Sequence, residues 1–172
     1  MTKRLYASWA AVLLLSCAAW AVPLTIFTRS GSTLRIKGAT FSPDDNPTGG
    51  NAIIMYEAMG ATGLDLIFFD FSGLQFNAAG GSCALDPDDS YIHCPAQGLT
   101  TIDVQLGQNP QNSLLLQGDA IPVPTVTTLK LTGSNVISGT GDFVTVNGGL
   151  FPNLSRIRSD LRAGTPHLQF SQ

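Results

Sequence analysis

Short apolar segments that end in glycine dominate the second half of the chain. Four of them follow one another between residues 113 and 149, and they read SLLLQG, TTLKLTG, NVISG and FVTVNGG. Each is too short for a typical helix but long enough for a strand, and glycine supplies the turn that ends it. This pattern predicts brief strands stacked as the rungs of a winding sheet, rather than the long strands of a sandwich.

The first half of the chain also predicts strands. AIIMYEAM and LDLIFFDFSG are rich in β-branched and aromatic residues, and PLTIFT and TLRIKG flank RSGS as the arms of a hairpin. TTIDVQLG alternates strictly, which places Ile102, Val104 and Leu106 inward and Asp103 and Gln105 outward. We therefore expect an all-β fold, with short strands and hairpins that lead into a parallel β-roll or solenoid-like segment. The alternative is an antiparallel β-sandwich.

The domain boundaries follow from the same pattern. One β-rich domain is expected over residues 22–152, with its glycine-rich, repeat-like part at 107–149. Residues 153–172 are expected to form a C-terminal tail or a short capping helix, since Leu154, Ile157 and Leu161 recur at helical spacing. Such a helix would cover an open sheet edge. A basic helix lying on a membrane surface is the sharper alternative.

The N-terminus has the features of a secretory signal peptide. Lys3 and Arg4 precede an uncharged apolar stretch, and Ala19-Trp20-Ala21 is a small-x-small cleavage site. We expect residues 1–21 to be removed and the protein to be secreted or held at the bacterial cell surface. A second interpretation of LLSC, which ends at Cys17, is a lipoprotein box. No later segment approaches the ~20 apolar residues of a membrane-spanning helix.

Charge limits the partners. Loss of the signal leaves seven of the nine basic residues against twelve acidic ones, a net charge of −5. This balance argues against nucleic acid as a partner, because phosphate binding needs basic surface. Charged residues make up only 12% of the chain, so long surface helices are not expected.

Two cysteines remain after the signal, Cys83 and Cys94. In an exported protein such a pair predicts a disulfide, with two free thiols as the alternative. Between them DPDD is typical of a type I turn, so the flanking residues form hairpin arms that bring the cysteines opposite one another.

No catalytic motif is present. The two histidines, His93 and His167, lie in no HExxH pattern, and the chain has no GxSxG. Three acid pairs are the only candidates for a hydrolase, and each falls in a predicted turn or at a strand end: Asp44-Asp45, Asp65 with Asp70, and Asp88-Asp89.

The order of segments from Gly31 to Gly149 resembles exported bacterial proteins of the RTX, or haemolysin-type calcium-binding, family. The segments that carry the resemblance are STLRIKG, PDDNPTGGNAI, LDLIFFDFSG, the paired cysteines, TTIDVQLGQNPQNSLLL, GDAIPVP and LTGSNVISGTGDF. The family's nonapeptide repeat, GGxGxDxUx with U a large apolar residue, implies a parallel β-roll that binds calcium through Asp carboxylates and turn carbonyls.

When the sequence is aligned with that repeat, it departs from the repeat at the positions of the calcium ligands. Ile137 and Val146 take the U positions, and Asn135 and Val144 then fall where the acids belong. The resemblance implies weak or vestigial Ca²⁺ binding, with Asn135, Asp142 and Asn112 as the candidate ligands. The leading hypothesis is an exported, non-enzymatic binding or cell-surface module. Alternatives are a structural or adhesive β-sandwich without metal, and a secreted hydrolase that uses the Asp pairs.

Overall fold

The computed structural model describes residues 24–40, 50–60, 63–70, 76–86, 91–118, 121–136, 141–162 and 164–171 of the chain. Every regular element in these ranges is a strand, so the predicted all-β fold class is confirmed. None of the described residues forms a helix long and apolar enough to cross a membrane.

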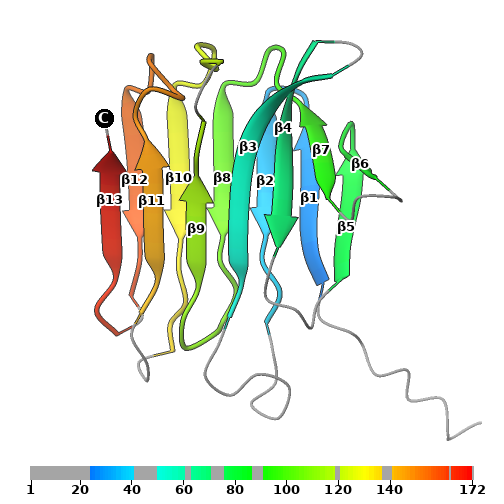
Figure 1. Ribbon diagram of the computed structural model, residues 1–172. Coiled ribbons are helices and arrows are strands. Elements are labelled where there is room, and N and C mark those ends of the chain that lie inside the picture. Colours follow the sequence, from blue (N-terminus) through cyan, green and yellow to red (C-terminus); the bar gives the residue numbers. More distant parts are fainter. Residues whose placement is uncertain are drawn as a thin grey trace, which may run out of the picture.

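The strands form two sheets that lie face to face (Figure 1). Sheet A has six strands in the order β12 (Arg156–Asp160), β10 (Thr128–Thr132), β8 (Thr101–Gln105), β2 (Thr33–Lys37), β1 (Leu24–Ser30) and β5 (Phe76–Gly81). Sheet B has seven, in the order β13 (His167–Ser171), β11 (Phe143–Asn147), β9 (Ser113–Leu116), β3 (Ala52–Gly60), β4 (Gly63–Asp70), β7 (Ile92–Pro95) and β6 (Ala84–Leu85).

From β8 onward the chain alternates between the two sheets. Each strand pairs in parallel with a strand of the preceding passage through the same sheet: β2 with β8, β8 with β10 and β10 with β12 in sheet A, and β3 with β9, β9 with β11 and β11 with β13 in sheet B. We call one such passage, a strand in each sheet, a coil. The four coils are β2 with β3, β8 with β9, β10 with β11, and β12 with β13.

The register of the coils stacks like positions in columns. In sheet A the column that starts at Leu34 continues through Ile102 and Leu129 to Ile157. In sheet B the column from Met55 runs through Leu116 and Val146 to Phe170, and its neighbour runs from Ile53 through Leu114 and Val144 to Leu168. These side chains fill the space between the sheets because a strand turns alternate residues to one face. The alternation predicted for TTIDVQLG is confirmed, since Ile102, Val104 and Leu106 are fully buried.

The N-terminal part of the molecule is mainly antiparallel. β1 and β2 form the predicted hairpin around RSGS, and β3, β4 and β7 pair in antiparallel order. Phe27 of sheet A meets Phe68 of sheet B, with ring centroids 5.1 Å apart. Two face-to-face sheets with these antiparallel pairs are also compatible with the sandwich alternative.

The predicted disulfide is confirmed. Cys83 and Cys94 are bonded, and their Cα atoms lie 4.2 Å apart. The next pair of residues inward, Ala84 and His93, are antiparallel partners, so the bridge lies across a hairpin as expected. The turn residues 87–90 are outside the described residues.

The capping helix expected within residues 153–172 is wrong, because this segment contributes β12 and β13. Leu154, Ile157 and Leu161 do recur at helical spacing, but Ile157 instead extends a column of sheet A, and Leu168 and Phe170 alternate as in a strand. Stacking on β10 and β11 overrides a weak local helical pattern.

Candidate functional site

A buried column of polar side chains runs along one corner of the coils. Asn51, Asn112 and Asp142 directly precede β3, β9 and β11, and each is at most 1% exposed. The Asn51 Nδ2 donates to Asn112 Oδ1 at 3.0 Å, and the Asn112 Nδ2 donates to Asp142 Oδ1 at 2.7 Å. Buried polar groups are costly unless they are hydrogen bonded, so this polar column fixes how one coil sits on the next.

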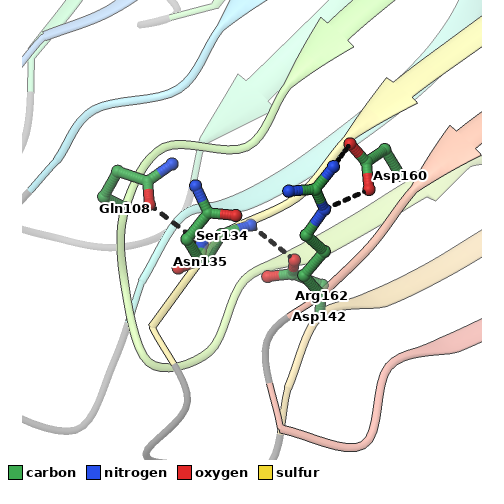
Figure 2. Close-up of polar contacts among 6 residues, drawn as sticks. All are labelled: Gln108, Ser134, Asn135, Asp142, Asp160 and Arg162. Carbon is green, nitrogen blue, oxygen red and sulfur yellow. Dashed lines mark hydrogen bonds and ion pairs between the residues drawn. The ribbon is translucent and has the colours of Figure 1, made fainter.

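Backbone groups and the Thr25 hydroxyl complete the polar column at its two ends. The Asn51 amide donates to the carbonyl oxygens of Ala39 and Leu106, each at 2.8 Å, and the Thr25 hydroxyl donates to Asn51 Oδ1 at 3.1 Å. At the other end the Ser134 backbone N–H donates to Asp142 Oδ2 at 2.8 Å (Figure 2).

A glycine makes room for the last member of the polar column. A Cβ added at Gly133 would lie 2.0 Å from Asp142 Oδ2, so a larger residue would displace the carboxylate. In the fourth coil the residue directly before β13 is Pro166, which has no side-chain donor or acceptor, and the column ends at Asp142.

Two of the three predicted calcium ligands lie together, and the third does not join them. Asn112 and Asp142 are hydrogen bonded to each other, whereas Asn135 is exposed and its backbone N–H donates to Gln108 Oε1 at 2.9 Å (Figure 2). The described residues contain no group of three or more His, Cys, Asp or Glu side chains that could hold a metal ion.

The side-chain oxygens of Asn112 and Asp142 already accept hydrogen bonds from N–H groups. Asn112 Oδ1 accepts from the Asn51 backbone and from the Asn51 and Asn109 amides at 2.9–3.1 Å. A cation needs oxygen lone pairs directed at it, so these donors would have to move before calcium could enter. Calcium binding by this chain therefore stays a prediction.

Asn51 belongs to the polar column but was not among the calcium ligands predicted from the repeat. It has a signal of its own in the sequence, because NAII, NSLL and DFVT each place an Asn or Asp directly before an apolar strand. In stacked coils such a recurrence indicates a column of hydrogen bonds rather than a set of separate ligands.

Most of the residues in the three acid pairs of the hydrolase alternative are not described by the structure. Asp44, Asp45, Asp88 and Asp89 lie outside the described residues, as does the side chain of Asp70. Asp65 is nearly buried, and its Oδ2 lies 3.7 Å from His93 Nδ1.

The outer face of sheet A gathers most of the positive charge. It carries six of the seven basic residues that follow the predicted signal: Arg35, Lys37, Lys130, Arg156, Arg158 and Arg162. Arg35, Lys37 and Lys130 occupy strand positions that alternate with buried apolar residues. Arg156 and Arg158 are in register with Thr128 and Lys130, and Arg162 lies two residues beyond Asp160. We call this set the basic face. The seventh, Arg29, donates instead to the carbonyl oxygens of Pro95 and Gln97.

The described strands of sheet A contain two carboxylates, Asp103 in β8 and Asp160 in β12. Asp103 pairs with Arg35 at 3.4 Å, and Asp160 accepts two hydrogen bonds from Arg162 at 2.5 and 2.6 Å (Figure 2). The hydrogen bond with Asp160, together with its charge, raises the pKa of Arg162 above its ordinary value. In the described part of the chain, no ion pair engages the other four cations, Lys37, Lys130, Arg156 and Arg158.

Hydroxyl groups lie beside these cations. Thr33, Thr101 and Thr128 are Cα partners on adjacent strands and point to the same side as Arg35 and Lys130. Next to them a shallow hollow of about 370 Å³ is lined by Thr28, Ser30, Thr33 and Arg35. The basic face thus presents cationic groups and hydroxyls on strands spaced about 4.8 Å apart.

No family model, no curated protein and no solved structure matches this chain.

Proposed function

We propose that the protein is an exported, non-enzymatic binding module whose basic face binds an acidic polysaccharide. The observation that carries the proposal is the gathering of six of the seven remaining cations on the outer face of one sheet, in a chain of negative net charge. Random placement of so few cations would leave some on sheet B, where the described strands β3, β4, β6, β7, β9, β11 and β13 contain neither Lys nor Arg.

The chemistry of the face favours a sugar polymer that carries carboxylate or sulfate groups. Arg and Lys supply charged donors to such anions, and Arg35 lies on the rim of the hydroxyl-lined hollow. The neighbouring Thr and Ser hydroxyls both donate and accept hydrogen bonds, as sugar hydroxyls do. An extended polymer crossing the strands would meet a new strand about every 4.8 Å.

Export is part of the proposal and is supported by two features. Residues 1–21 have the pattern of a signal peptide, and Cys83 and Cys94 form a disulfide, which persists in oxidising compartments. A calcium-linked role of the RTX kind has no observation in its favour beyond the contact of Asn112 with Asp142.

The test is titration of the mature chain with dextran sulfate, with neutral dextran as the reference polymer. We expect dextran sulfate to bind, neutral dextran not to bind, and the affinity to fall as salt rises. Neutralising Lys37 and Lys130 together, as Lys37→Gln with Lys130→Gln, should reduce the slope of log K against log salt by about 1.5, if each contact contributes about 0.7–0.9 as it does for nucleic acids.

A matched control separates the face from the net charge. Thr145→Glu with Ser113→Glu also makes the chain more negative by two charges, but it places them on the outer face of sheet B and should leave the affinity close to that of the wild type. Equal losses in the two double variants would contradict a specific face. A DNA duplex that bound as tightly as dextran sulfate would contradict the choice of polysaccharide.

A further inference from the structure

The last coil carries apolar residues at the same positions as the inner coils, but these residues are partly exposed. Ile157, Leu168 and Phe170 occupy the inward columns, yet they are 43%, 36% and 43% exposed. Their neighbours in the third coil, Leu129 and Val146, are fully buried. Apolar side chains exposed together at one end form a patch of the kind that marks an interface.

Both backbone edges are open at this same end. β12 is the outermost strand of sheet A and β13 the outermost strand of sheet B, so among the described strands neither has a partner on its outer side (Figure 1). Each edge presents a row of N–H and C=O groups that can pair with another strand.

We propose that a second copy of this chain covers this end, so that two molecules pack end to end about a two-fold axis. In that arrangement β12 pairs in antiparallel order with its own copy, and so does β13. The two strands have five residues each and run in opposite directions (Figure 1), so a two-fold axis perpendicular to the sheets can pair both edges, and the proposal centres it on Arg158 in β12 and Gln169 in β13. An interface of this type is self-complementary and closed.

The side chains fit this pairing. Centred on Gln169, antiparallel β13 places Leu168 opposite Phe170 of the partner subunit, which buries both in the continued column. Centred on Arg158, antiparallel β12 places Arg156 opposite Asp160 of the partner subunit, and the axis repeats this pair of opposite charges. Arg158 meets its own copy in a solvent-exposed position, which opposes the pairing weakly because water and salt screen it.

Among the described strands, the other end of the molecule does not offer a matching surface. There the outer strands are β5, with six residues, and β6, with two, and β6 lies beside the disulfide. A head-to-tail stack would need five-residue edges in both sheets, so end-to-end packing stops at two copies rather than growing into a fibre. This inference does not rest on polysaccharide binding, although Arg156 and Arg158 belong both to the basic face and to the paired edge.

The test is sedimentation velocity of the mature chain over a wide range of concentration, without added polymer. We expect a reversible monomer–dimer equilibrium. Phe170→Glu should weaken the dimer by about tenfold or more, because it places a charge in the centre of the interface. The melting temperature of dilute Phe170→Glu should fall only slightly below that of the wild type, since 43% of this side chain is already exposed in the monomer.

Two further variants keep the inference falsifiable. Arg158→Thr removes the like-charge contact on the axis and should tighten the dimer, a gain that misfolding cannot imitate. Tyr56→Glu, at a 37% exposed aromatic residue in β3, is the matched control and should leave the dimer unchanged. A wild-type chain that stays monomeric, that forms larger polymers, or whose dimer is indifferent to Phe170→Glu would overturn the inference.

Discussion

The third and fourth coils differ in burial although their strands follow the same alternation. Leu129 and Val146 in the third coil are fully buried, while Ile157 and Phe170, one step further along the same columns, are more than two-fifths exposed. A core position in stacked coils is therefore covered by the coils on either side of it, and its own sequence pattern is not sufficient.

The polar column shows the same difference. Asn112 in the second coil is held from both sides, by Asn51 and by Asp142, whereas the equivalent residue of the fourth coil is Pro166 and makes no side-chain hydrogen bond. Stability should accordingly be concentrated in the inner coils and fall toward the C-terminal end.

The largest expected contrast lies in the polar column. Asn112→Ala removes one acceptor from each of the buried Asn51 and Asn109 amides and the side-chain donor to Asp142 Oδ1, and should lower the free energy of unfolding by about 3–5 kcal/mol. Pro166→Ala, at the equivalent place in the last coil, should change it by less than about 0.5 kcal/mol. Urea denaturation of both variants measures the difference, and similar losses would contradict it.

The apolar columns should show the next largest contrast. Leu129→Ala removes a fully buried side chain between two coils and should cost about 2–5 kcal/mol. Ile157→Ala, one coil further, should cost less than about 1 kcal/mol in dilute, monomeric protein, because its side chain is already 43% exposed. A larger loss for Ile157→Ala than for Leu129→Ala would reverse the proposed gradient.

The opposite end of sheet B is held covalently. The Cys83–Cys94 bridge closes a short loop, and replacing both residues by Ala should destabilise the chain by about 2–3 kcal/mol through the entropy of the unfolded state. Hydrogen exchange should then speed up at β6 and β7 first, with the amides of β10 still protected. If hydrogen exchange instead sped up equally in all strands, the two ends of the molecule would not differ in local stability.

Calcium should have the smallest effect. Because Asn112 and Asp142 already accept N–H hydrogen bonds, calcium in excess over a magnesium reference should leave the melting temperature unchanged. If calcium did bind, with a dissociation constant one hundredth of the added concentration, it would raise the free energy of unfolding by ~2.7 kcal/mol. A rise that disappears in Asp142→Asn would restore calcium binding as a property of the polar column.

Local pattern accounts for the parts of the fold that could be predicted from the sequence. Strict alternation in TTIDVQLG and the spacing of Cys83 and Cys94 gave the inward side chains and the disulfide correctly. Both depend on neighbours close in the chain, where strand geometry leaves few choices.

What the sequence did not predict depends on contacts distant along the chain. The strand at 156–160 is set by pairing with β10, twenty-eight residues earlier, and that contact overrides helical spacing. Asn51 and Asn112 are sixty-one residues apart, so their contact is visible only after the coils are stacked. The cations of the basic face likewise come mainly from strands β2, β10 and β12, which are distant along the chain. The negative net charge gave no indication that these cations share one face.

The most direct test of the stacked coils is the pattern of interstrand NOEs in the isotope-labelled protein. Parallel pairing predicts backbone contacts between Ile102 and Leu129 and between Leu129 and Ile157, together with contacts between Leu114 and Val144. Close contacts of antiparallel type between β8 and β9, or between β10 and β11, would make these strands hairpins and would contradict the account.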